Sequence, residues 1–232
     1  FGMPARRLDG ADVNAFEPAL QPGLAGGWWY EGDAHLRPDR LMAGWRRILK
    51  ARGVIIHENC PAHGFEIDHS HATAVVTDQG PISADAFIVA TGAWAPLLNG
   101  ALGCRLRIQP GKGYSMTMPR PVACPTVPLI LVEHRVAVTP MQSGYRLGST
   151  MEFAGYDATL NRARLQLLRE GAGHYLREPS CEPVQEEWCG WRPMTPDSLP
   201  YIGFSPKLSN VLIAAGHNML GVSMSPATGK LA

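Results

Sequence analysis

The most informative part of this chain includes Asn210-Val-Leu-Ile-Ala-Ala-Gly-His-Asn-Met-Leu-Gly221. The apolar run from Val211 to Ala215 predicts a buried strand, and a helix is expected from about Leu220. A glycine-rich turn between them aims the free N–H groups and the positive end of the helix dipole at one place. Such a turn stabilises negative charge on a bound group, and a plain tight turn between core elements is the alternative.

Upstream of this segment, the stretch Gly190-Trp-Arg-Pro-Met-Thr-Pro-Asp197 predicts a proline-flanked turn that contains one arginine. The planar guanidinium of Arg192 can meet a carboxylate through two parallel hydrogen bonds. Pro193 and Pro196 restrict the backbone, so less conformational entropy is lost when the guanidinium is aimed. The segment therefore favours a carboxylate site. By residue type alone, a surface or ion-paired arginine is the alternative.

A third segment, Ile88-Val-Ala-Thr-Gly-Ala-Trp-Ala95, is an apolar strand followed by Thr-Gly, and nucleotide cofactors bind where strands of a parallel sheet end in this way. Together the three segments resemble the D-amino-acid oxidase/dehydrogenase superfamily of FAD enzymes, most closely its bacterial D-amino-acid dehydrogenase branch. The resemblance implies non-covalent FAD and assigns the substrate carboxylate to Arg192. It implies that the flavin is contacted by Thr91, Gly92, Trp94, Gly216, His217, Asn218, Met219 and Gly221.

The segment Pro110-Gly-Lys-Gly-Tyr-Ser115 resembles the start of the substrate domain in the same branch. The resemblance implies that Lys112 or Tyr114 faces the flavin or the substrate, and Tyr114 is the second candidate catalytic residue. A β-turn with a solvated lysine is the alternative.

Several other side chains have a plainer interpretation. His69 and His71 could form a metal pair, but they stand in a predicted hairpin turn without a third ligand, so no metal is expected. His35 lies where the family places residues near the substrate entrance, and a surface loop histidine is the alternative. Cys189 is near the position where sarcosine-oxidase-type relatives attach flavin covalently. The Gly-Trp-Arg-Pro that follows it resembles the branch with non-covalent FAD.

The superfamily begins with a strand, Gly-x-Gly-x-x-Gly and a helix, and no glycine cluster of this chain has that spacing after a strand. The resemblance covers the chain from about residue 20 to its end. The chain also begins at Phe1 and ends within a predicted helix. We therefore expect a C-terminal fragment of a longer enzyme, inactive without the missing N-terminal part.

The hydrophobic pattern predicts a mixed α/β (α+β) chain: a partial Rossmann-like FAD-binding domain plus an antiparallel-sheet substrate domain, with the chain crossing between them. We expect a substrate-domain segment and linker at 1–37 and part of the FAD-binding domain at 38–100. The substrate-binding sheet is expected at 101–205 and a C-terminal FAD-binding segment at 206–232. Residues 1–37 are expected to be irregular.

Helices are predicted from Pro38 to just before Gly53 and over Ala158–Leu176, the second capped by Asp157. The predicted strands are Val54–His57, Phe65–Asp68, Ala74–Thr77, Ile82–Ala90, Arg105–Gln109, Tyr114–Met118, Leu129–Glu133, Arg135–Thr139, Tyr145–Ser149, Gln185–Trp191 and Val211–Ala215. The run Ala86–Ala90 is expected to be buried on both faces of a parallel sheet.

Composition is that of an ordinary globular protein. The 232 residues are 45% hydrophobic and 18% charged. The net charge of +1 lacks the excess of basic residues that is typical of nucleic-acid-binding proteins. No apolar run approaches the ~20 residues that span a bilayer. Five cysteines without C-x-x-C spacing argue for a reducing compartment. A cytoplasmic protein is expected, and peripheral association with the cytoplasmic membrane stays open.

The resemblance implies an oxidoreductase that oxidises the CH–NH bond of a D-amino acid, or a related secondary amine, by hydride transfer to flavin N5. The imino acid then hydrolyses to a 2-oxo acid and ammonia. The expected partners are the amino-acid substrate and a quinone or oxygen as electron acceptor. Two alternatives remain: a glycine/sarcosine-type amine oxidase that uses oxygen, and a non-catalytic binding module.

Overall fold

A computed structural model describes residues 4–232, and the first three residues of the predicted 1–37 segment lie outside this range. The chain forms two compact units whose segments alternate along the sequence. Unit 1 comprises the chain up to Val54 together with Gly113–Met151 and Ala158–Cys189. Unit 2 comprises Ile55–Lys112, Glu152–Asp157 and Gly190–Ala232.

These units divide the chain at residues other than the predicted domain boundaries. The helix after Pro38 belongs to unit 1, and residues 190–205, which contain Arg192, belong to unit 2. The assignment of cofactor-binding and substrate-binding roles to the predicted segments stays a prediction.

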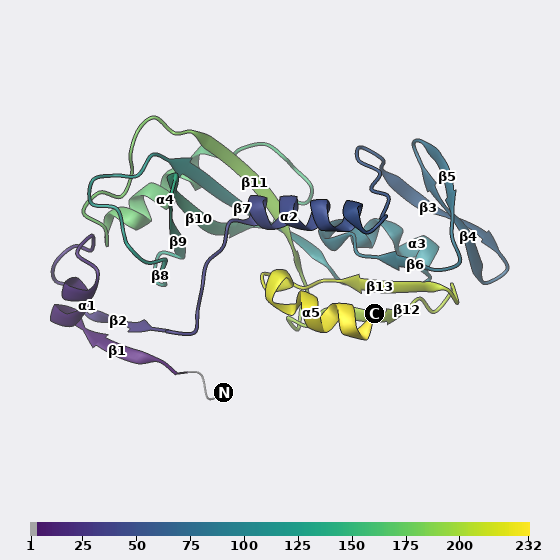
Figure 1. Cartoon of the computed structure of the whole chain (residues 1–232), viewed down its shortest axis with the longest axis horizontal. Coiled ribbons are helices and arrows are strands. Elements are labelled where there is room, and N and C mark those ends of the chain that lie inside the picture. The colour runs from purple at the N-terminus through teal and green to yellow at the C-terminus, as the bar shows by residue number, and fades with distance from the viewer. Residues whose placement is uncertain (1–3) are drawn as a thin grey trace. The chain divides into compact units, whose positions relative to one another are not determined.

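A five-stranded sheet in the order β11-β7-β10-β9-β8 belongs mostly to unit 1, whereas residues 109–112 of β7, Glu152 of β10 and residues 190–194 of β11 belong to unit 2 (Figure 1). Its strands are β7 (Gln109–Met118), β8 (Leu129–Leu131), β9 (Val136–Met141), β10 (Gly144–Glu152) and β11 (Glu186–Met194). Strands β9 and β10 form a hairpin, in which Gly144 pairs with Met141 in antiparallel register. The remaining elements of unit 1 are β1 (Arg6–Asp9), α1 (Gly10–Phe16), β2 (Gly26–Trp29), α2 (Pro38–Ala51) and α4 (Arg162–Gly173).

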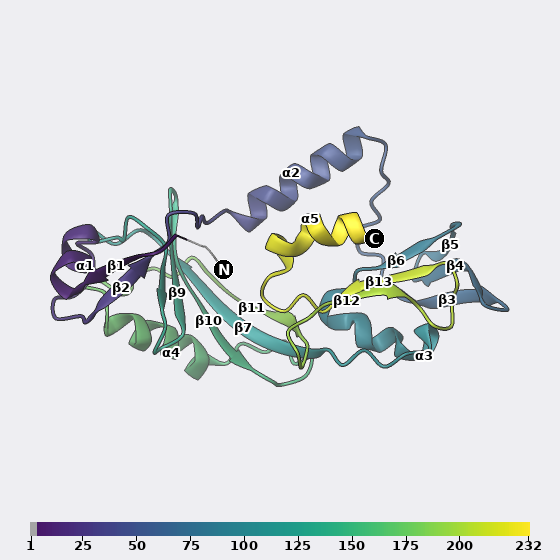
Figure 2. The same cartoon turned by 90° about the horizontal axis from the view of Figure 1, so that it is seen from below.

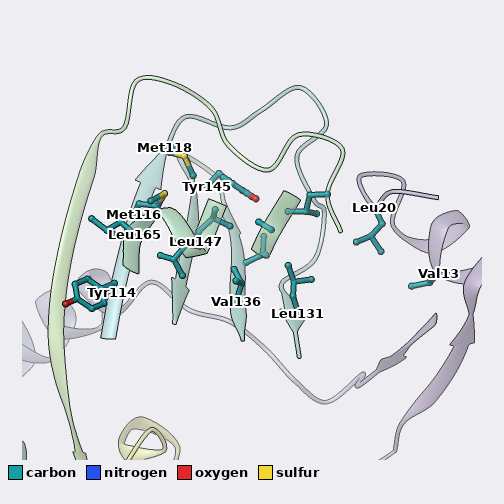
Figure 3. Packing of buried hydrophobic residues seen from close by; sticks show 14 of the residues in the cluster. Val13, Leu20, Tyr114, Met116, Met118, Leu131, Val136, Tyr145, Leu147 and Leu165 are labelled. Atoms are coloured by element: carbon teal, nitrogen blue, oxygen red, sulfur yellow. The ribbon is translucent and has the colours of Figure 1, made fainter. Parts of the chain in front are cut away.

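The core of unit 1 lies between this sheet and α4. Alternate residues of the strands point to one face, as the period of two requires. In Figure 3 the side chains of Met116, Leu147 and Leu165 meet in one apolar cluster. Leu168 and Leu176 belong to the same cluster and are fully buried. The alternation in the sequence therefore predicted the strands that build this core.

Unit 2 combines three-stranded sheets with short helices (Figures 1 and 2). One sheet has the order β12-β13-β6, in which β13 pairs with β12 antiparallel and with β6 parallel. The other is the antiparallel meander β3-β4-β5. The bounds are β3 (Ala62–Asp68), β4 (His71–Thr77), β5 (Gly80–Ser83), β6 (Phe87–Val89), η1 (Gly92–Leu98), α3 (Asn99–Leu102), β12 (Tyr201–Phe204), β13 (Val211–Ala215) and α5 (Gly221–Leu231). The predicted mixed α/β class is confirmed.

Some expectations for the first hundred residues were wrong. Residues 1–37 were expected to be irregular, but they contain β1, α1 and β2. Val54–His57 forms no strand, because the expected run has no paired partner there. The run Ile82–Ala90 is two strands, β5 and β6, rather than one. Ile88 is 61% exposed, since β6 is the last strand of its sheet and is not covered on both faces by the described residues.

Other corrections concern where elements begin. Residues Arg105–Ile108 precede β7 and are not a strand. Helix α4 is shorter than predicted and begins after Asn161, whose side chain accepts hydrogen bonds from the N–H groups of Ala163 and Arg164. Asp157, the expected cap, lies in another segment. Because β11 is an edge strand, it tolerates Pro193 and continues to Met194, so Arg192 lies on a strand and not in a turn.

Candidate functional site

The turn after β13 is built on a glycine that the geometry requires. Gly216 has φ +85°, a left-handed backbone that L side chains rarely adopt. A Cβ there would lie 2.8 Å from Cγ2 of Thr195 and 3.3 Å from Cδ2 of Tyr201. The backbone at Gly216 therefore approaches the Thr195 segment more closely than any side chain would allow.

Asn218 joins this turn to the segment that follows Arg192. Its backbone N–H donates to the Pro193 carbonyl at 3.1 Å. Its side chain accepts from the N–H of Thr195 and donates to Thr195 Oγ1, both at 2.9 Å. Asn218 itself has φ +53°, and asparagine is among the few residues that adopt this conformation readily. The two motifs quoted from the sequence are thus held together by one side chain.

Arg192 is half-buried on β11, immediately before this joint. Burial lowers the pKa of its guanidinium from the ordinary value, because removing water disfavours the charged form. Arginine nevertheless stays protonated at any physiological pH. A partly desolvated guanidinium attracts a carboxylate more strongly than an exposed one, because water and salt screen the pair less.

Trp94 and Trp191 connect the Thr-Gly turn to the same strand. Their rings meet edge to face, with centroids 5.6 Å apart. The Nε1 atom of Trp191 is buried and has no hydrogen-bond partner among residues 4–232. Native structures rarely leave such a donor unmatched, so this N–H suits an acceptor on a bound group.

A pocket of about 710 Å³ adjoins the Thr-Gly turn. Its lining includes three residues predicted to contact the flavin, Thr91, Gly92 and Trp94. His63 also lines it, and its Nε2 lies 2.5 Å from Asp78 Oδ1. Pockets of this size hold cofactors and small ligands. The sequence did not single out His63, because a lone histidine on a strand has no distinguishing pattern.

Helix α5 begins at Gly221, one residue after the expected start. No side chain caps its first turn, which leaves the N–H groups of that turn available to a ligand. His217 instead bonds back to the helix, with Nε2 at 2.8 Å from Thr228 Oγ1. Met219 is exposed. The turn that was predicted to contact a flavin therefore consists of a glycine, an anchored histidine, the Asn218 joint and an open helix start.

Tyr114 belongs to unit 1, whereas the other candidate site residues belong to unit 2. Its ring is 2% exposed and packs in the apolar cluster of unit 1, with the hydroxyl directed away from the cluster (Figure 3). Its catalytic role stays a prediction. Lys112 was expected to be either near the site or solvated, and the structure buries it completely in unit 2.

The remaining candidates lie elsewhere. His69 and His71 end up at the β3–β4 turn, and His71 Nε2 contacts the Asn210 amide at 3.2 Å. No group of three or more metal-ligating side chains occurs in the described part of the chain. His35 lines a second pocket of about 540 Å³, in unit 1, together with Arg37, Arg40 and Arg120.

The thiol of Cys189 contacts the Ala158 carbonyl at 3.5 Å, and all five cysteines are free. Within residues 4–232, no helix is both long enough and apolar enough to cross a membrane.

Two polar joints of the site were missed from sequence. Asn218 was quoted as a flavin neighbour, but its bonds to Pro193 and Thr195 were not foreseen. Tyr156 was not singled out at all, although its hydroxyl reaches the Ala93 carbonyl at 2.8 Å. Each joint connects segments far apart in the sequence, so no local pattern reports it.

Comparison with protein families matches one family, described as FAD dependent oxidoreductase, over residues 1–232. A D-amino acid dehydrogenase of Paramagnetospirillum magneticum is 35% identical over 230 residues, which cover 95% of this chain and 53% of that protein. A glycine oxidase of Pseudomonas putida is 32% identical, over 97% of this chain and 63% of the relative.

Among solved structures, the glycine oxidase from Geobacillus kaustophilus superposes with a TM-score of 0.91 at 27% identity. The match covers 99% of this chain and 62% of that one. The chain thus spans roughly half to two thirds of the length of these three proteins.

Proposed function

The chain belongs to the family of FAD-dependent oxidoreductases, and on this premise we propose that it is part of an enzyme that oxidises the CH–NH bond of a D-amino acid. The product is the imino acid, which water hydrolyses to a 2-oxo acid and ammonia. The observation that carries the proposal is the joint between the Arg192 segment and the turn after β13, formed by Asn218. It links the candidate carboxylate-binding segment to the candidate flavin turn, and both belong to unit 2.

The residues of unit 2 fit a flavin in three respects. Gly216 keeps the backbone open where a side chain would collide with Thr195. Trp191 offers a buried N–H that lacks a partner in the described residues. The first turn of α5 has no side-chain cap, which suits the negative charge of a reduced flavin. When bound, FAD supplies the acceptor for the hydride that leaves Cα. We propose that it is bound non-covalently, by the residues predicted from sequence.

In this proposal Arg192 binds the substrate carboxylate and thereby orients the substrate. Hydride transfer depends on alignment more than on a strong acid or base, so positioning is the main contribution of the protein. The half-buried guanidinium gives directional, weakly screened binding. The joint at Asn218 keeps the residues after Arg192 from moving, so the guanidinium is aimed before substrate arrives.

A glycine-oxidase-type reaction is the second candidate. It is favoured by the similarity to glycine oxidases in both sequence and structure. The two candidates share the carboxylate anchor and differ in the electron acceptor: a quinone or another carrier in the dehydrogenase, oxygen in the oxidase. With a quinone acceptor, peripheral contact with the membrane is part of the proposal.

Anaerobic reduction of the flavin tests the proposed function. The complete gene product is mixed with D- and L-amino acids, glycine and sarcosine while the visible flavin absorbance is followed. We expect D-amino acids to bleach it, and we expect Arg192→Ala to raise the substrate concentration at half-maximal rate by about two to four orders of magnitude, as loss of a charged hydrogen-bond partner costs ~3–5 kcal/mol.

Arg164→Ala, at a helix position remote in the sequence, is the matched control and should leave the rates unchanged. Bleaching by glycine or sarcosine, with peroxide formed in air, would select the oxidase. A flavoprotein that none of these amines reduces would overturn the substrate class, and a colourless protein would favour the non-catalytic binding module.

A further inference from the structure

Lys112 is the only lysine among the buried polar residues of the described chain, with no side-chain surface exposed to water. Its Nζ lies 3.7 Å from Glu152 Oε1 and 3.6 Å from Asp157 Oδ2, and all three residues belong to unit 2. Burying an ammonium is costly unless carboxylates compensate for the lost water. The two carboxylates stand at the two ends of the segment Glu152–Asp157, so the lysine holds this segment at both ends.

The middle of the same segment contacts the Thr-Gly turn, whose residues Thr91, Gly92 and Trp94 are predicted to contact the flavin. The Asp157 N–H bonds to the Ala154 carbonyl and Gly155 has φ +60°, which makes a tight turn. Tyr156 projects from this turn, and its hydroxyl donates to the Ala93 carbonyl at 2.8 Å. Partial desolvation raises the pKa of Tyr156, although 39% of the residue remains exposed.

The Ala93 carbonyl needs such a donor for a reason visible in the sequence. Gly92–Leu98 is a 3-10 helix, in which each carbonyl accepts a hydrogen bond from the N–H three residues later. Three residues after Ala93 stands Pro96, which has no N–H. Ala93 is almost fully buried, so water cannot easily replace the missing donor. The hydroxyl of Tyr156, 63 residues away in the chain, supplies it.

On the premise of the function proposed above, we propose that Lys112 is a positioning residue of the flavin site. Its ammonium fixes both ends of the Glu152–Asp157 segment, and Tyr156 on that segment completes the backbone hydrogen bonding of the Thr91–Trp94 turn. The lysine acts on the cofactor through this segment and not by contact.

A double-mutant cycle in the complete gene product tests the proposal. Lys112→Met keeps the length of the side chain and removes the charge, and Tyr156→Phe removes only the hydroxyl. If the lysine acts through Tyr156, each variant weakens FAD binding by about tenfold, and the double variant is no weaker than the worse single one. Lys207→Met, an exposed lysine of the same unit whose Nζ contacts the Gly100 carbonyl at 3.4 Å, is the control and should bind FAD normally.

Hydrogen exchange of the apoprotein provides a readout that does not depend on flavin. We expect the amides of residues 93–99 to exchange about tenfold faster in Lys112→Met and in Tyr156→Phe, with the amides of β9 unchanged. If the wild type fails to bind FAD while this exchange pattern appears, the proposed function fails and the segment's role stands. Unchanged exchange in residues 93–99, or fully additive losses of FAD affinity, would overturn the positioning role. If Lys112→Met does not fold, the Tyr156→Phe and Asp157→Asn pair gives the same cycle.

Discussion

The core of unit 1 and the candidate site of unit 2 are held together in different ways. In unit 1, strands β7, β9 and β10 and helix α4 share one cluster of buried aliphatic and aromatic side chains. In unit 2, the turns of the site are fixed by single polar side chains, such as Asn218 and Tyr156. Apolar packing is spread over many residues, whereas each polar joint depends on one. We therefore expect core substitutions to lower global stability, and joint substitutions to loosen the site with a smaller loss of stability.

The largest effect is expected in the core of unit 1. Leu168 is fully buried, and Leu168→Ala should lower the free energy of unfolding by about 2–5 kcal/mol, because a cavity remains in addition to the lost burial. Urea denaturation measures this loss. FAD affinity of the folded variant should be unchanged. The neighbouring Leu167 is 47% exposed, and Leu167→Ala should change stability by less than about 0.5 kcal/mol. Equal losses for the two variants would show that α4 does not pack as described.

A smaller effect on stability, with a larger one on the site, is expected at Asn218. Asn218→Ala removes the partner of the Thr195 N–H and should cost about 1–3 kcal/mol. FAD affinity and the apparent KM for the amino acid should both worsen. Asn218→Gly separates the two roles of the residue, because glycine adopts the positive φ freely but makes no side-chain bonds. If Asn218→Gly matched the wild type in FAD binding, only the backbone conformation would matter and the joint would be refuted.

The smallest effect concerns an exposed pair on the surface of unit 1. The Arg37 guanidinium hydrogen-bonds Asp39 and lowers the pKa of that carboxyl to about 2. Because the folded-state pKa is below the ordinary one, the contribution of this pair to stability is present above about pH 4 and is lost as pH falls towards 2. NMR titration should show this low pKa, and Arg37→Gln should return it towards the ordinary value. Since the pair is exposed, the midpoint of unfolding at neutral pH should hardly move. An unshifted Asp39 in the wild type would contradict the pairing.

Helices α2 and α4 show what periodicity can predict. Both have apolar residues at helical spacing, and both were expected from that pattern. Helix α4 buries Leu165, Leu168 and Ala172 in the core, whereas α2 buries none of its residues. Trp45 of α2 is 46% exposed within the described chain. The helical spacing of apolar residues predicts that a helix has an apolar face. It does not predict which part of the protein packs against that face.

Neighbouring residues in the sequence were enough to predict most of the local elements and to indicate a candidate chemistry. Alternation predicted β7, β9 and β10, a continuous apolar run predicted β13, and the position of Pro38 predicted the start of α2. The residue types around Arg192 and Gly216 indicated a carboxylate anchor and a turn without a side chain. These features depend on residues that are neighbours along the chain. Side-chain volume, the spacing of apolar residues and the φ preferences of glycine and proline set the local backbone conformation.

Contacts between residues far apart in the sequence follow from the tertiary structure. The bonds from Asn218 to Thr195, from Tyr156 to Ala93 and from Lys112 to its carboxylates each join separate segments. It also decided that Arg192 lies on an edge strand instead of a turn. A hydrogen bond between remote residues depends on the path of the whole chain, because many side chains of the same type could serve equally well. Local sequence therefore identified the groups, and the fold selected their partners.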